Sequence, residues 1–236
     1  MRGNSVKNSS SFIPDTPSDT GLTYPESPAA RSHWIIGQRG QKNTLDPSRP
    51  YAWLLEKERD DDGSLVDWLT IFLTNKECPW RCLMCDLWQN TLDETVPAGA
   101  IAGQIDFAIG QAERECGGLA KLRQVKLYNA GSFFDVKAIP KAEDASIAKR
   151  LAKFDRVIVE CHPALVGDRC LQFRDRLSGQ LEVALGLETV HPEALQKLNK
   201  RVTLDQFRAA AELVTQNGMA LRAFVLLQPP FIPPEE

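Results

Sequence analysis

The stretch "LVDWLTIFLTNKECPWRCLMC" (65–85) determines the expected fold, because a run of apolar, β-branched and aromatic residues leads directly into three cysteines. Residues 65–75 have the composition of a strand. The preceding segment "YAWLLEKE" (51–58) is similar, and the Asp and Gly residues of "RDDDGS" (59–64) between the two favour a turn. The sequence therefore predicts a β-hairpin whose second strand runs into the cysteine-containing segment.

Downstream of the cysteines the pattern alternates between helix and strand. Periodic apolar segments predict helices over 98–116, 144–154, 167–179 and 203–218, and short apolar runs predict strands over 124–132, 156–163, 181–189 and 220–230. Thr203 and Gln206 form a potential capping box, and Gly218 is expected to end that helix. This alternation indicates right-handed crossovers and a parallel sheet, and the apolar runs suggest strands that are covered on both faces.

The predicted fold class is α/β, a partial (β/α) TIM-like barrel with about five parallel strands, preceded by a β-hairpin. A complete eightfold barrel needs roughly 250 residues. The 236-residue chain is therefore expected to be either an open partial barrel or a chain that stops before its natural end. We expect a disordered tail at 1–34, rich in Ser, Pro, Thr, Asp and Asn, an N-terminal extension with a hairpin strand at 35–67, and a core at 68–236 that is C-terminally incomplete.

The composition fits a globular protein, with 43% hydrophobic and 25% charged residues. No segment resembles a signal peptide or approaches the roughly 18 to 20 apolar residues of a membrane helix, so we expect a cytoplasmic protein. In that compartment the six cysteines would be thiols or metal ligands. The net charge of −3 gives no general attraction to nucleic acid, and the short basic segment "KLNKRV" (197–202) is only a weak signal for it.

Three cysteines lie within eight residues, in the spacing C-x3-C-x2-C: Cys78, Cys82 and Cys85. The next cysteine, Cys116, lies 31 positions further on. Thiolates at this spacing can bind three irons of a [4Fe-4S] cube and leave the fourth iron open, which is a mark of a catalytic metal site. A structural zinc would need a fourth ligand, which a histidine distant in sequence would have to supply. A third alternative is that the three thiols only pack in the structure.

The cysteine spacing at the end of the first strand of a half-barrel resembles the radical S-adenosylmethionine (SAM) superfamily. The segments "YNAGSFFD" (128–135), "GLETVHPEALQKLNK" (186–200) and "FVLLQPP" (224–230) also resemble it, and the likeness covers about residues 65–236. The resemblance implies that Cys78, Cys82 and Cys85 hold a [4Fe-4S] cluster. It further implies that SAM chelates the open iron and is cleaved by one electron to a 5'-deoxyadenosyl radical.

The resemblance also implies SAM contacts at the ends of the strands. The glycine-containing turn that includes Asn129, Gly131 and Ser132 would receive the SAM amino group, Glu188 would supply a polar contact, and Leu227 would flank the adenine. Many members of the superfamily have an aromatic residue just before the third cysteine. Met84 holds that position here, and its thioether can still pack against adenine.

Two carboxylates end predicted strands, Glu160 and Glu188. A carboxylate in such an apolar segment must be solvated or paired, because burying it alone is costly. Ribose hydroxyls or the SAM amino group would be suitable partners. The alternative is a salt bridge to Lys126, Arg222 or another basic residue. The sequence identifies no catalytic side chain.

Within the superfamily, the chain resembles the branch that holds the elongator catalytic subunit, the methylthiotransferases and oxygen-independent coproporphyrinogen oxidase. It is most similar there to the radical SAM subunit of archaeosine synthase and its uncharacterised bacterial relatives. This likeness implies the modification of a tRNA nucleoside, with tRNA and an electron donor such as a flavodoxin or ferredoxin as partners. Fold-level similarity does not by itself transfer a substrate. The alternative function is a non-catalytic, zinc-stabilised α/β module that docks on a partner.

Overall fold

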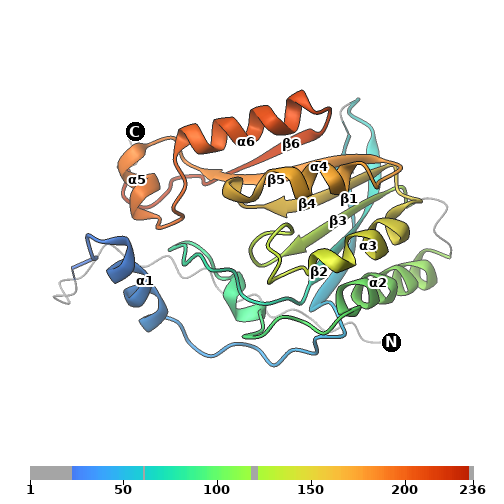
Figure 1. Ribbon diagram of the computed structural model, residues 1–236, viewed down its shortest axis with the longest axis horizontal. Helices are drawn as coiled ribbons and strands as arrows, with labels where there is room; N and C mark the ends of the chain where they lie inside the picture. Colours follow the sequence, from blue (N-terminus) through green and yellow to red (C-terminus); the bar gives the residue numbers. More distant parts are fainter. Residues whose placement is uncertain (1–22, 61, 118–121, 234–236) are drawn as a thin grey trace.

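In the part of the chain that the structure describes, six strands form one sheet in which each strand lies beside its neighbour in the sequence (Figure 1). The computed structural model describes residues 23–60, 62–117 and 122–233. The strands are β1 (Ala52–Arg59), β2 (Leu65–Leu73), β3 (Gln124–Asn129), β4 (Arg156–Cys161), β5 (Gln180–Glu188) and β6 (Ala220–Val225). β1 pairs antiparallel with β2, and the pairings from β2 to β6 are all parallel. The α/β fold predicted from the sequence, with a hairpin followed by parallel strands, is confirmed.

The hairpin turn forms as its composition predicted. The Ser64 carbonyl accepts a hydrogen bond from the Asp60 N–H at 2.8 Å, and the Asp62 carboxylate accepts one from the Ser64 N–H at 2.8 Å. Gly63 has a φ of +83°, a backbone conformation that glycine adopts without steric cost. The turn therefore sets the register that places Ala52 opposite Phe72.

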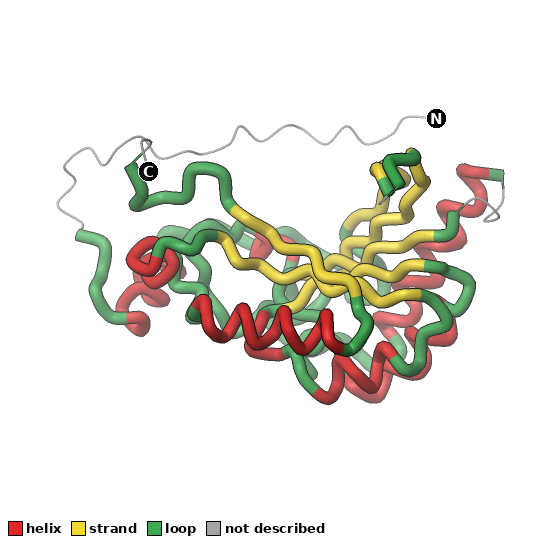
Figure 2. Tube along the Cα trace, turned by 90° about the horizontal axis from the view of Figure 1, so that it is seen from above, coloured by secondary structure: helices red, strands yellow, loops and turns green. Residues whose placement is uncertain are grey.

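Helices cover one face of the sheet (Figure 2). They are α2 (Ala100–Cys116), α3 (Asp144–Leu151), α4 (Asp168–Arg174) and α6 (Leu204–Gln216). The main apolar core lies between these helices and side chains such as Ile71, Val125 and Val183, which are fully buried. The predicted capping box at the start of α6 is present, since Thr203 and Gln206 each bond the other's backbone N–H.

The opposite face of the sheet differs from the prediction of two apolar faces. Lys126 on β3 is only 2% exposed, and its ammonium pairs with Glu56 at 2.8 Å and with Glu58. Glu182 on β5 pairs with Arg222 and with Arg156, each at 2.6 Å. The apolar runs in the sequence did not indicate these charges. Lys126 pairs across β2 with carboxylates on β1, and Glu182 pairs with side chains on the two adjacent strands, so each buried charge has a partner.

Two α-helices in the described part of the chain were not predicted: α1 (Pro28–Gly37) and α5 (Pro192–Lys197). Helix α1 begins within the segment 1–34 that was expected to be a tail, and residues 1–22 of that segment lie outside the described residues. Ser27 caps this helix by accepting the Ala30 N–H at 3.2 Å, and the buried Arg31 guanidinium donates to the Gln196 carbonyl at 2.8 Å. The polar composition of the segment did not reveal these long-range contacts.

Among the described residues, no helix has the length and apolarity needed to span a membrane.

Candidate cofactor site

The three cysteines lie in the loop that follows β2, at the carboxyl end of the parallel strands. Cys78, Cys82 and Cys85 are partly buried free thiols. The loop backbone is fixed by the segment after α5: the Leu83 N–H donates to the Leu198 carbonyl at 2.9 Å, and the Asn199 side chain donates to the Arg81 carbonyl at 2.8 Å. Segments more than 100 residues apart in the sequence therefore hold the loop together.

An aromatic stack attaches the same loop to the end of β4. The rings of Trp80 and His162 lie 3.8 Å apart between centroids, at an interplanar angle of 7°. His162 Nδ1 lies 3.2 Å from the Ala164 N–H and accepts from it, so Nε2 carries the proton and donates to the Lys200 carbonyl at 3.1 Å. Burial lowers the pKa of His162 to about 4, so the ring is neutral near pH 7. His162 is therefore a structural support of the cysteine loop, a role that its isolated position in the sequence did not indicate.

The environment of the three thiols favours their protonated form. Burial raises the pKa of Cys78 to about 11 and that of Cys82 to about 12. Burial also raises the pKa of Cys85, although the backbone N–H groups of Leu87 and Trp88 oppose the shift. A metal centre that binds these sulfurs must therefore displace their protons, and its own charge would stabilise the thiolates.

Within the described residues, no three His, Cys, Asp or Glu side chains converge closely enough to bind a single metal ion. A cube-shaped iron–sulfur cluster has a different requirement, because each thiolate binds a separate iron atom. The set of donors, three thiols on one loop, matches that requirement in kind.

The turn after β3 packs directly against the first cysteine. Gly131 has a φ of +125°, and a Cβ placed on it would lie 2.5 Å from the Cys78 Cβ. The Asn75 side chain joins the two loops further by donating to the Ala130 carbonyl at 3.3 Å. Glycine is therefore required at 131 both for its backbone conformation and for the close approach of the cysteine loop.

The residues on either side of Gly131 differ in their surroundings. Asn129 is 1% exposed, and neither atom of its side-chain amide has a hydrogen-bond partner among the described residues. Buried polar atoms without partners are uncommon, so Asn129 is a candidate ligand contact. Ser132 is fully buried, and its hydroxyl lies 3.4 Å from the Cys161 sulfur, so the structure gives this side chain a packing role.

The two carboxylates at the strand ends have different partners. Glu160 accepts the Asn129 N–H at 3.2 Å, and burial raises its pKa to about 7. Glu188 forms a buried ion pair with Lys200 at 2.5 Å. This is the salt bridge that the sequence left as an alternative for Glu188, with a basic residue other than Lys126 or Arg222. Lys126 and Arg222 instead pair with other carboxylates.

Lys200 is the functional candidate that the sequence analysis missed. Its ammonium occupies space that a side chain at 186 would fill, since a Cβ on Gly186 would lie 2.0 Å from the Lys200 Nζ. The lysine charge acts on Cys82 and Glu160, lowering the pKa of each against the larger effect of burial. In the sequence it lies at the end of "GLETVHPEALQKLNK" and within the basic segment "KLNKRV", and neither segment assigned it this role.

The other two predicted contacts are less defined. Met84 is partly buried in the cysteine loop, and Leu227 is 95% exposed beyond the end of β6. A cavity of about 970 Å³ lies elsewhere, between α1, α5 and the start of α6, and no predicted site residue lines it.

Comparison with known proteins gives relatives along most of the chain. No protein-family model matches. An uncharacterised protein of Methanocaldococcus jannaschii is 28% identical over 205 residues, which cover 83% of this chain and 56% of the relative. Archaeosine synthase subunit beta of Methanosarcina acetivorans is 28% identical over 184 residues, covering 72% of this chain and 51% of the relative. The chain thus spans about half the length of the curated relatives it matches.

A solved structure shares the fold. The cobalamin-dependent S-adenosylmethionine radical enzyme OxsB, with aqua-cobalamin bound, matches with a TM-score of 0.50 and 15% sequence identity, covering 72% of this chain and 29% of OxsB. At this identity the match concerns the fold alone. The chain therefore shares the fold of OxsB and is similar in sequence to archaeosine synthase subunit beta.

Proposed function

We propose that this chain is the core of a radical SAM enzyme that binds a [4Fe-4S] cluster through Cys78, Cys82 and Cys85 and binds S-adenosylmethionine beside it. The observation that carries the proposal is the placement of three free thiols on one loop at the carboxyl end of the parallel strands. In sheets of this kind, ligands bind at that end of the strands. The similarity to archaeosine synthase subunit beta supports the same assignment.

The residues around the thiols fit these groups. The absence of a side chain at Gly131 leaves the backbone of its turn directly against Cys78, and the unpaired amide of Asn129 offers both a donor and an acceptor nearby. Cys78, Cys82 and Cys85 would hold the cluster, which, once reduced by an electron donor, would supply one electron for cleavage of SAM to methionine and a 5'-deoxyadenosyl radical. The protein's own contribution is orientation and the exclusion of water.

Charges at the strand ends suit an amino acid group on the ligand. Lys200 would attract the SAM carboxylate, and Glu160, with a pKa of about 7, would accept a hydrogen bond from the SAM amino group. Glu188 holds the Lys200 ammonium in place through their ion pair. Met84 and Leu227 remain the proposed apolar contacts of the adenine, and Ser132 supports the turn from within.

We propose a tRNA nucleoside as the substrate class, on the strength of the relatives named archaeosine synthase subunit beta. That name also implies a complex with a second type of subunit. An electron donor such as a flavodoxin or ferredoxin would reduce the cluster, and we place the protein in the cytoplasm.

The test is SAM cleavage by protein reconstituted with iron and sulfide without oxygen. With a reductant and SAM, wild type should yield 5'-deoxyadenosine, measured by chromatography, whereas Cys82→Ser should yield none. A protein that retains zinc and yields no 5'-deoxyadenosine would instead support the zinc-stabilised docking module. Nucleoside analysis of tRNA incubated with the active protein and its partner subunit tests the substrate class separately.

A further inference from the structure

A short segment between α1 and β1 crosses the cysteine loop. We call residues 38–43 the strap. The Asn43 N–H donates to the Gln89 carbonyl at 2.8 Å, and the Asn43 side chain donates to Asn90 at 2.8 Å. The Arg39 guanidinium lies over the Trp88 ring, 5.0 Å from its centroid. The strap therefore contacts the loop just after its third cysteine.

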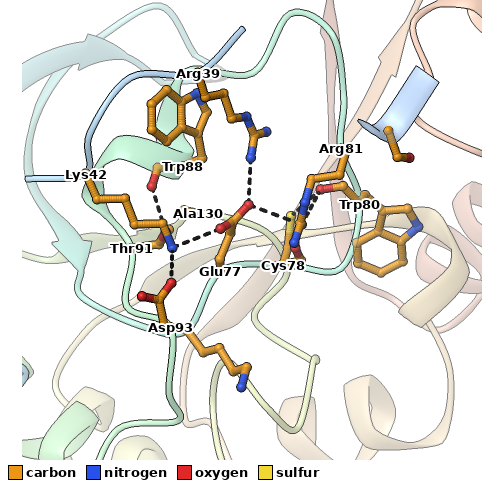
Figure 3. A network of polar contacts seen from close by, with 12 residues as sticks. Arg39, Lys42, Glu77, Cys78, Trp80, Arg81, Trp88, Thr91, Asp93 and Ala130 are labelled. Carbon is orange, nitrogen blue, oxygen red and sulfur yellow. Dashed lines mark hydrogen bonds and ion pairs between the residues drawn. The ribbon is translucent and has the colours of Figure 1, made fainter. Parts of the chain in front are cut away.

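Glu77, which directly precedes the first cysteine, is the centre of this contact (Figure 3). Its carboxylate pairs with Arg39 at 2.8 Å, with Lys42 at 2.9 Å and with Arg81 at 3.1 Å. The side chain of Glu77 is 15% exposed, and those of the three cations are 11 to 24% exposed. One carboxylate thus joins two strap residues to a residue that lies between the first and second cysteines.

Arg81 extends the network into the loop backbone. Its guanidinium donates to the Trp80 carbonyl at 3.0 Å and to the Cys78 carbonyl. Figure 3 shows Glu77 between the strap cations on one side and Arg81 on the other. The conformation of the backbone at Cys78 is therefore linked to the strap through a single acidic side chain.

The other end of the N-terminal segment is also fixed. The Tyr24 hydroxyl donates to the Lys197 carbonyl at 2.6 Å, and Arg201 donates to the Ser32 hydroxyl at 2.9 Å. These two contacts involve the last residue of α5 and the segment that follows it. The same segment bonds the backbone of the cysteine loop at Arg81 and Leu83. The strap is therefore bonded to the cysteine loop at Asn43, and the segment that leads into it is fixed at Tyr24 and Ser32.

We propose that Glu77 is a positioning residue, which locks the cysteine loop to the strap and so holds the three thiols ready to bind the cluster. Neutralising Glu77 would leave three cations close together with no central carboxylate, and their mutual repulsion would open the loop. A loss of about 1.4 kcal/mol from these partly buried pairs would make an open loop about tenfold more populated.

The first test uses metal-free protein, and so does not depend on the proposed function. The rate at which Cys78, Cys82 and Cys85 react with a thiol reagent is measured by mass spectrometry in wild type, Glu77→Gln and Asp93→Asn. Asp93 is the matched control, because it also pairs with Lys42, at 2.7 Å, but is 85% exposed. Because the Glu77 charge itself raises the pKa of the adjacent Cys78 thiol, loop opening is measured at Cys82: Glu77→Gln should react about tenfold faster there, and Asp93→Asn should match wild type within about twofold.

The second test rests on the proposed function and measures iron release to a chelator after anaerobic reconstitution. Glu77→Gln should release iron several-fold faster than wild type, whereas Glu77→Asp, which keeps the charge, should fall in between.

A second variant covers the case in which Glu77→Gln fails to fold. Arg39→Gln removes the same ion pair from the side of the strap and should also speed thiol labelling. Equal labelling of wild type and the folded variants would overturn the positioning role. Faster labelling in a protein that takes up no iron would retain that role and reject the cluster.

Discussion

The ion pair between Glu188 and Lys200 gives the sharpest stability prediction. Both side chains are about 10% exposed, and the charged atoms lie 2.5 Å apart. Replacing Lys200 with methionine leaves the Glu188 carboxylate buried without its cation, and breaking a buried pair from one side costs about 3 to 5 kcal/mol. We therefore expect Lys200→Met to lower the free energy of unfolding by about 3 kcal/mol.

The assay is urea denaturation of the metal-free chain near pH 7. With a urea dependence of about 2 kcal/mol per molar, a loss of about 3 kcal/mol lowers the unfolding midpoint by about 1.5 M. The double variant Glu188→Gln/Lys200→Met should cost clearly less than the two single variants together, because neither charge is then left alone. As a control, Lys57→Met removes an exposed pair with Asp67 and should cost less than about 1 kcal/mol. A single-variant cost below about 1 kcal/mol, or full additivity of the two, would refute the reasoning.

Three further predictions concern the surroundings of the thiols. Gly131→Ala should lower the free energy of unfolding by roughly 2 kcal/mol or more, because its Cβ would strike Cys78 and its φ is positive; a denaturation midpoint equal to that of wild type would contradict the described packing. His162→Phe keeps an aromatic ring against Trp80 but removes the buried imidazole. Burial and the nearby Lys200 charge both favour the neutral form of that imidazole. Since the pKa is about 4 in the folded chain and about 6.5 unfolded, His162 should destabilise the wild type by up to about 1.4 kcal/mol per pH unit as the pH falls from 6.5 to 4. His162→Phe should lose this part of the pH dependence, and identical slopes in both proteins would disprove it. Cys161→Ala removes a buried thiol that accepts a hydrogen bond from the Ser132 hydroxyl, and it should leave the iron content of reconstituted protein unchanged. A loss of iron would indicate that Cys161 is a ligand.

Local patterns in the sequence predicted the elements that local forces determine. The hairpin follows from turn residues between two apolar segments, and the start of α6 follows from Thr203 and Gln206, which lie three residues apart. The three thiols were equally visible, because their spacing lies within one loop. Each of these features depends on residues that are close in the chain.

Most of the features that were missed depend on contacts between residues that are distant in the sequence. Helix α1 is stabilised by Arg31, whose partner lies 165 positions away. His162 supports the cysteine loop because its ring stacks on Trp80. Lys200 reaches the site because Gly186 has no side chain where the ammonium lies. A composition or a spacing carries no record of such pairs, so only the three-dimensional structure could bring these residues into the site.

The iron content of anaerobically reconstituted protein tests the central claim most directly. We expect about four iron atoms per chain, with the broad visible absorbance of an iron–sulfur cluster, and a loss of both in Cys78→Ala, Cys82→Ala and Cys85→Ala. Wild-type protein that remains colourless, or single cysteine variants that keep the full iron content, would contradict the account.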